Sequence, residues 1–119
     1  MGEGWRLPTN QEWQNLAKPY GGVRDDSKDG GKSAYTALIN GGRSLFNVVY
    51  GGGRDSADGS YARVDEHGFY WTATEVDSTN AWLYNFGKNG KIMNRHNDGV
   101  KSWAISVRCI RDMNNAKGQ

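Results

Sequence analysis

Two histidines are the residues of this chain best suited to acid–base or metal chemistry. His67 follows Asp65 and Glu66, and the three together resemble half of a metal site, whereas His96 has no neighbouring ligand. Because adjacent side chains in a turn or strand diverge, this cluster specifies no third ligand. A turn is therefore the favoured interpretation. A metal-dependent hydrolase that uses His67 or His96 is the weaker alternative, and no metal ligand is assigned.

A charged loop after the first expected helix resembles the opening of a calcium-binding loop. Asp25, Ser27, Asp29 and Gly30 have the spacing of its first ligands and its turn. The twelfth position is Thr36, where such loops normally carry a glutamate that binds calcium through both oxygens. A solvated loop is therefore favoured, and a calcium site stays the alternative.

The other reactive groups do not combine into a catalytic set. Cys109 is the only cysteine, and its apolar alternation with Ile105 and Val107 favours a buried structural thiol over a nucleophile. The glycines at 51–53 are followed by Arg54 rather than by the Lys and Ser or Thr of a phosphate-binding loop, so a bend beside the core is favoured. The sequence thus predicts neither a cofactor nor an enzyme.

The stretch from Asn80 to Trp103 is better suited to recognition. It combines amides, basic residues and large aromatics on an expected hairpin and turn, and these residue types suit adaptable binding surfaces. The alternative is that the aromatics cover the core, which we accept for Phe86. The predicted ligand-binding residues are Trp82, Tyr84, Asn94, Arg95, Asn97 and Trp103.

These residues must be positioned by strands, of which the one expected at 68–74 is central. It has the highest aromatic density in the chain and is rich in strand-favouring residues. Its alternation places Phe69 and Trp71 on a core face, with Tyr70 and Thr72 on a semi-polar face. Asn89-Gly90, between two apolar runs, then predicts a hairpin with a type I′ turn. The predicted cross-strand pairs are Phe86 with Met93, Tyr84 with Arg95 and Trp82 with Asn97.

Two helices are expected before these strands. Thr9 and Glu12 fit a capping box at the start of a helix over Thr9–Lys18. Ser33 is placed to cap a shorter helix over 34–40. The other expected elements are strands at 46–50, 60–64 and 103–111 and a turn at 97–99. Helices early in the chain and antiparallel strands late predict an α+β fold.

Bulk properties narrow the function classes. The 119 residues suffice for one domain, assigned to 1–112, followed by a polar tail at 113–119. The net charge is +2 with both signs interspersed, which argues against nucleic acid as a partner. No apolar run approaches the length of a membrane helix, and Met1 leads into folded-looking sequence without a signal peptide.

Three sequence blocks together resemble a known family. They are Gly4-Trp5-Arg6-Leu7-Pro8-Thr9 with Glu12-Trp13, then Gly68-Phe69-Tyr70-Trp71-Thr72-Ala73-Thr74, and finally Ser106-Val107-Arg108-Cys109-Ile110-Arg111-Asp112. In this order they resemble the Fibrobacter succinogenes major paralogous domain. The resemblance implies a C-type-lectin-like fold, related to the formylglycine-generating enzyme and to retroelement-diversified variable proteins. It also implies an exported, often lipoprotein-associated or surface protein of Bacteroidetes type, with a protein or glycan ligand.

The chain departs from this pattern in two ways. The calcium-dependent sugar motifs of animal lectins are absent, and a lone Cys109 is inadequate for formylglycine-type chemistry. Little sequence precedes Trp5, although such domains carry an N-terminal strand beside the C-terminal one. An uncovered edge there predicts either a homodimer through the C-terminal strand, which we prefer, or an edge covered by Gly4–Leu7. A structural or assembly domain of a larger surface protein is the alternative to ligand recognition, and an enzyme of the formylglycine-generating type is the weaker alternative.

Overall fold

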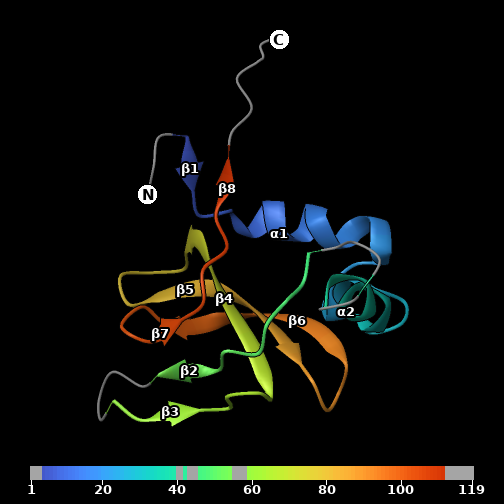
Figure 1. Ribbon diagram of the computed structural model, residues 1–119. Coiled ribbons are helices and arrows are strands. Elements are labelled where there is room, and N and C mark those ends of the chain that lie inside the picture. The colour runs from blue at the N-terminus through green and yellow to red at the C-terminus, as the bar shows by residue number, and fades with distance from the viewer. Residues whose placement is uncertain (1–3, 40–41, 43–45, 55–58, 112–119) are drawn as a thin grey trace.

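The chain folds around three long antiparallel strands with two helices on one side of them (Figure 1). The computed structural model describes residues 4–39, 42, 46–54 and 59–111. The helical elements are α1 (Asn10–Ala17), η1 (Lys18–Tyr20), η2 (Arg24–Asp26) and α2 (Lys32–Leu38). The strands are β1 (Trp5–Arg6), β2 (Gly53–Arg54), β3 (Tyr61–Ala62), β4 (His67–Glu75), β5 (Asn80–Gly87), β6 (Ile92–Val100), β7 (Ala104–Ile105) and β8 (Ile110–Arg111). The predicted α+β class is confirmed. The predicted polar tail lies outside the described residues.

Helix α1 begins as its capping sequence predicts. The Thr9 hydroxyl accepts a hydrogen bond from the amide of Glu12 at 3.1 Å, and the Glu12 carboxylate accepts one from the amide of Thr9 at 2.9 Å. This reciprocal pair satisfies two amides of the first turn. The α-helix ends at Ala17, continues into η1, and stops at Gly21, whose φ of 101° is left-handed.

Helix α2 begins two residues earlier than predicted, and Ser33 is not its N-cap. Gly31 takes that position with a φ of 85°, and a Cβ there would lie 2.5 Å from the carbonyl oxygen of Met93. The carboxylate of Asp29 accepts hydrogen bonds from the amides of Ser33 and Gly31 instead. Asp29, which the sequence placed in a candidate calcium loop, thus serves the helix start.

The main sheet has the order β4-β5-β6, so β5 rather than β4 is its middle strand. The predicted pairs of Phe86 with Met93 and Tyr84 with Arg95 are confirmed. The turn type is wrong, because neither Asn89 nor Gly90 has a positive φ and Lys91 has one of 54°. A bulge also places both Asn97 and Asp98 opposite Trp82. The predicted turn at 97–99 is therefore part of β6.

The face of β4 that the sequence assigns to the core is the wrong one. Tyr70 is 2% exposed and packs against Trp13 of α1, whereas Phe69 and Trp71 are half-buried on the opposite face. Burial of the tyrosine costs little, because its hydroxyl accepts a hydrogen bond from the amide of Val49 at 3.0 Å. The tyrosine hydroxyl made this face look semi-polar in the sequence.

The predicted last strand over 103–111 is interrupted. It divides into β7 and β8, with a single bridge between Ser106 and Tyr70 in the middle, and Val107 is 52% exposed. Cys109 is half-buried rather than core. Strand β1 pairs antiparallel with β8, so the lead-in occupies one edge of β8, where the sequence preferred a homodimer contact.

The segment 46–54 connects α2 to the sheets without the strand predicted at 46–50. Val48 makes one isolated bridge with Ile39, and Asn47 has a φ of 61°, which is incompatible with a continuous strand. The glycines at 51–53 form the expected bend, since Gly52 has a φ of 63° and bridges Gly68. A small sheet then follows with the order β3-β2-β7.

Candidate functional site: the open face of the main sheet

The two faces of the main sheet have different neighbours. We call the side that carries α1 and α2 the helix face, and the side toward the small β3-β2-β7 sheet the open face. Strand alternation and pairing assign the side chains at the middle of the three strands to the open face. They are Phe69, Trp71, Leu83, Asn85, Asn94 and His96.

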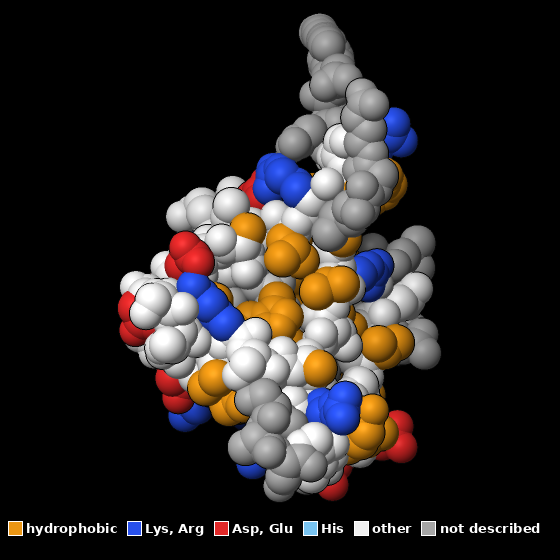
Figure 2. All heavy atoms as spheres, turned by 90° about the vertical axis from the view of Figure 1, so that its left-hand side faces the viewer, with side chains coloured by type: hydrophobic (Ala, Val, Ile, Leu, Met, Phe, Trp, Pro, Cys, Tyr) orange, Lys and Arg blue, Asp and Glu red, His pale blue; other side chains and the backbone are white. Residues whose placement is uncertain are grey.

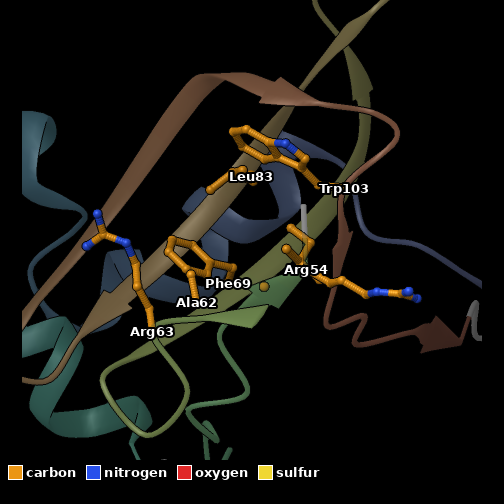
Figure 3. A pocket seen from close by; sticks show the side chains of 8 residues that line it. Arg54, Ala62, Arg63, Phe69, Leu83 and Trp103 are labelled. Carbon is orange, nitrogen blue, oxygen red and sulfur yellow. The ribbon is translucent and has the colours of Figure 1, made fainter. Parts of the chain in front are cut away.

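A pocket of about 200 Å³ lies where the small sheet meets the open face. Its apolar walls come from Phe69 and Leu83 of the main sheet and from Trp103 and Ile105 near β7. Gly53 and Ala62 complete the lining with little side-chain bulk. Figure 3 shows the Trp103 ring above Leu83 and Phe69, with the Arg54 and Arg63 side chains on opposite sides of the pocket.

A shallower hollow of about 410 Å³ adjoins Trp71, and Leu7, Ala73 and Ala81 contribute to its lining. Lys101 also lines it and forms an ion pair with Glu75. On the side of the molecule that lies at the left of Figure 1, apolar side chains gather at the centre of the surface, with basic and acidic groups around them (Figure 2). An apolar centre with a polar rim is the usual anatomy of a docking surface.

Gly99 allows Trp71 and Leu83 to lie close to β6. A Cβ at this position would lie 2.6 Å from Cδ2 of Leu83 and 2.9 Å from Cζ3 of Trp71. Contacts this short do not occur without displacement of the neighbours, so the absence of a side chain at Gly99 allows both groups to occupy their positions. Gly99 is therefore part of the open face, although it contributes no functional group.

His67 contacts three other side chains of the protein. Its Nδ1 lies 2.8 Å from Oδ1 of Asn85, its ring stacks on Phe69 at 5.3 Å, and its Nε2 lies 3.4 Å from Arg63. Within the described parts of the chain, no three His, Cys, Asp or Glu side chains come together as a metal-binding group. The contacts of His67 with Asn85 and Phe69 orient these two side chains at the border of the open face.

The six predicted ligand-binding residues are divided between the two faces. Asn94 lies on the open face and Trp103 on the pocket wall. Asn97 is exposed at the bulge in β6. Trp82 and Arg95 belong to the helix side, where the guanidinium of Arg95 lies 5.3 Å from the Trp82 ring. Arg95 also forms an ion pair with Asp25 at 3.2 Å, so this second carboxylate of the candidate calcium loop is engaged as well.

Tyr84 is not available to a ligand, which corrects its assignment to the binding surface. It is fully buried, and its ring stacks on Trp13 at 5.2 Å. Its hydroxyl donates to Oδ1 of Asn10 at 2.6 Å. Burial raises the pKa of this phenol to about 12, so it remains a neutral donor inside the core.

Sequence reasoning missed the other side chains of the pocket. Phe69 and Leu83 were absent from the predicted site because their faces of β4 and β5 were taken as core or were not assigned. Ile105 was placed on a continuous strand. A signal was nevertheless present, since apolar residues on both alternating faces of β4 mean that both faces are covered at least in part.

The arginines in the sequence blocks have structural contacts. Arg6 forms two hydrogen bonds of 2.7 Å with the carboxylate of Glu12, as expected for a structural pair. This interaction is the main reason that the pKa of Glu12 is lowered to about 2. Arg108 lies over the Phe46 ring at 4.1 Å and Arg111 over the Trp5 ring at 5.8 Å.

Comparisons with known proteins agree with the resemblance seen in the sequence blocks. No curated protein and no solved structure matches this chain. Among the described residues, no helix has the length and apolar character needed to cross a membrane. The model of the Fibrobacter succinogenes major domain matches residues 2–111, which is nearly the whole chain. The chain therefore belongs to the Fibrobacter succinogenes major domain family.

Proposed function

We propose that this chain is a non-catalytic recognition module that binds a partner through the open face of its main sheet. The supporting observation is that Phe69, Trp71 and Trp103 expose part of their aromatic surface around two hollows. On the helix face, by contrast, Tyr70, Tyr84 and Phe86 are fully buried. Aromatic side chains that remain half-exposed in a concave surface typically serve as anchors for a partner.

The floor of this surface is rigid, which favours recognition. Phe69, Leu83 and Asn94 belong to three consecutive antiparallel strands whose pairing extends over most of their length. The backbone of paired strands loses little additional freedom on binding, so less of the contact energy is offset by ordering. The amides of Asn85 and Asn94 provide hydrogen-bonding groups beside the apolar centre.

We also propose, from the resemblance of the three sequence blocks, that the fold is C-type-lectin-like and that the protein is exported or displayed at the cell surface. A protein or a glycan is the proposed ligand class. A role in assembly of a larger surface protein is a second candidate. It is favoured by Trp5, which is 46% exposed on β1, outside the main core.

The experiment compares two pairs of substitutions on the two faces. The purified domain is screened against a displayed peptide library and a glycan array, and the best binder is then titrated. Trp71→Ala with Asn94→Ala removes an anchor and an amide from the open face, and we expect affinity to fall by about tenfold or more. Trp82→Ala with Arg95→Ala is the matched control on the helix side, and we expect a change below about threefold.

Loss of binding in the control pair alone would place the site on the helix side. Absence of any binder in both screens would count against recognition and favour the assembly role. Thermal unfolding of each variant shows whether a loss of affinity reflects a loss of fold.

A further inference from the structure

We propose that the pocket between the two sheets receives one apolar side chain, aromatic or branched, from an acidic segment of a protein partner. This inference rests on the proposed function and specifies the partner of the same surface. It selects protein over glycan, and it states which chemical features of the partner the pocket recognises.

The size of the pocket favours a single side chain. Sites for drug-sized molecules and cofactors enclose about 300–1,000 Å³, whereas this one encloses about 200 Å³. Interface anchors typically fill pockets of this smaller kind, where a buried aromatic or aliphatic group contributes most of the binding energy.

The chemistry of the lining argues against a sugar. Phe69, Leu83 and Trp103 offer carbon surface, and the backbone at Gly53 is already paired on both sides, with Ala62 and with Ile105. A sugar hydroxyl buried there would lose its hydrogen bonds to water without replacement, and each such loss costs about 1–3 kcal/mol. An apolar side chain has no such cost.

Two guanidinium groups flank the pocket and determine the charge of the segment that carries the anchor. Arg54 donates to the carbonyl oxygen of Gly59 at 3.0 Å and lies over the Tyr61 ring, and Arg63 lies beside His67. Neither forms an ion pair with a carboxylate among the described residues. This distinguishes them from Arg6 and Arg95, which each have an acidic partner.

Both arginines are exposed, and their side chains extend to opposite sides of the pocket (Figure 3). A partner segment that inserts an apolar anchor between them therefore passes basic groups before and after the anchor. Carboxylates on both sides of the anchor complement this arrangement, whereas lysine or arginine would be repelled.

A peptide array with three matched sets tests the proposal, and a glycan array is probed in parallel. The first set has Phe, Leu, Ile or Trp flanked by Asp and Glu. The second has the same anchors flanked by Lys. The third keeps the acidic flanks but replaces the anchor with Gly. We expect the first set to bind best, by about tenfold over each of the others.

Two variants examine the pocket in the intact chain. Ala62→Phe fills it from an exposed strand position at which phenylalanine is well tolerated, and binding of the first set should fall by about tenfold. Arg63→Glu should reduce binding of the first set and improve that of the second. Lys18→Glu makes the same charge change at an exposed residue directly after α1, and we expect little effect.

The outcomes separate this inference from the proposed function. If glycans, or peptides without an apolar anchor, bind and lose affinity when Trp71 and Asn94 are replaced, the pocket inference is overturned and the recognition function stands. The same holds if the first set binds equally well to Ala62→Phe. If neither array binds the wild-type chain, both proposals are overturned.

Discussion

The two faces of the main sheet carry similar aromatic residues but bury them to different extents. On the helix face, Tyr70, Tyr84, Phe86 and Met93 are at most 2% exposed and pack around Trp13. On the open face, Phe69 and Trp71 remain half-buried. The two faces differ in the elements that pack against them. Two helices close the first face, whereas a small sheet of two-residue strands only partly covers the second.

This contrast shows that aromatic content does not by itself mark the core of a sheet. A tyrosine can be fully buried when its hydroxyl finds a partner, as Tyr84 does at Asn10. A tryptophan can remain at the surface when nothing large enough covers it. The element that packs against a strand decides which of its faces becomes the core.

The largest expected effect comes from exchanging one tryptophan on each face for alanine. Trp13→Ala removes a side chain that is 1% exposed and should destabilise the domain by about 3–5 kcal/mol. Trp71→Ala removes a half-buried ring and should cost only about 1–2 kcal/mol, because less surface leaves water on folding. Urea unfolding followed by circular dichroism compares them. A larger loss for Trp71→Ala would reverse our assignment of the two faces.

A smaller effect is expected at Gly99, where the open face tolerates no added volume. Gly99→Ala places a methyl group against Leu83 and Trp71 and should cost about 1–3 kcal/mol through overpacking. Binding at the open face should also weaken, since both neighbours line it. Gly90→Ala is the control, because its Cβ would have only ordinary contacts with Ile92. Equal effects of the two substitutions would argue against a tight contact at Gly99.

The cap of α1 gives a prediction that separates stability from binding. Thr9→Ala removes the acceptor of the Glu12 amide and should cost about 1 kcal/mol. The affinity for an open-face ligand should stay the same, because α1 covers the other side of the sheet. Titration of the variant with the selected peptide measures this. A parallel loss of affinity would mean that the two faces are coupled.

The smallest expected effect is a loss of folding stability at low pH. The pKa of Glu12 is lowered from 4.5 to about 2, mainly by the hydrogen bond from Arg6. Because this pKa is lower in the folded state, the ionised carboxylate contributes stability at pH values above its unfolded-state pKa. This contribution is lost as the pH falls from about 4.5 toward 2. Both side chains reach solvent, so it should not exceed about 1 kcal/mol. Between pH 6 and pH 2.5, Glu12→Gln should lose less stability than the wild-type chain. An identical loss would exclude this linkage.

The sequence predicted local features well. The capping box at Thr9 and the register of Phe86 with Met93 are set by neighbouring residues, and both are confirmed. The predicted type of the turn between β5 and β6 was wrong, because Asn89-Gly90 is compatible with more than one loop of the same register.

The binding surface was harder to predict because it depends on long-range packing. Alternation separates the faces of β4, but only the placement of Trp13 decides which of them is buried. The bulge opposite Trp82 and the interruption between β7 and β8 also arise from tertiary contacts such as the bridge of Ser106 to Tyr70. Trp82, Tyr84 and Arg95 were therefore assigned to the same surface as Asn94 and Trp103, which lie on the other side.

The pairing of β1 with β8 has a mechanical consequence. Trp5 is opposite Arg111 and Arg6 is opposite Ile110, so the first strand and the last strand are antiparallel neighbours. A force applied to the outer ends of these strands acts across the ribbon and opens the two residue pairs one after the other, rather than shearing both at once. We therefore expect the ribbon to separate at low force, with the load then reaching the tie between Arg6 and Glu12 before it reaches the sheet.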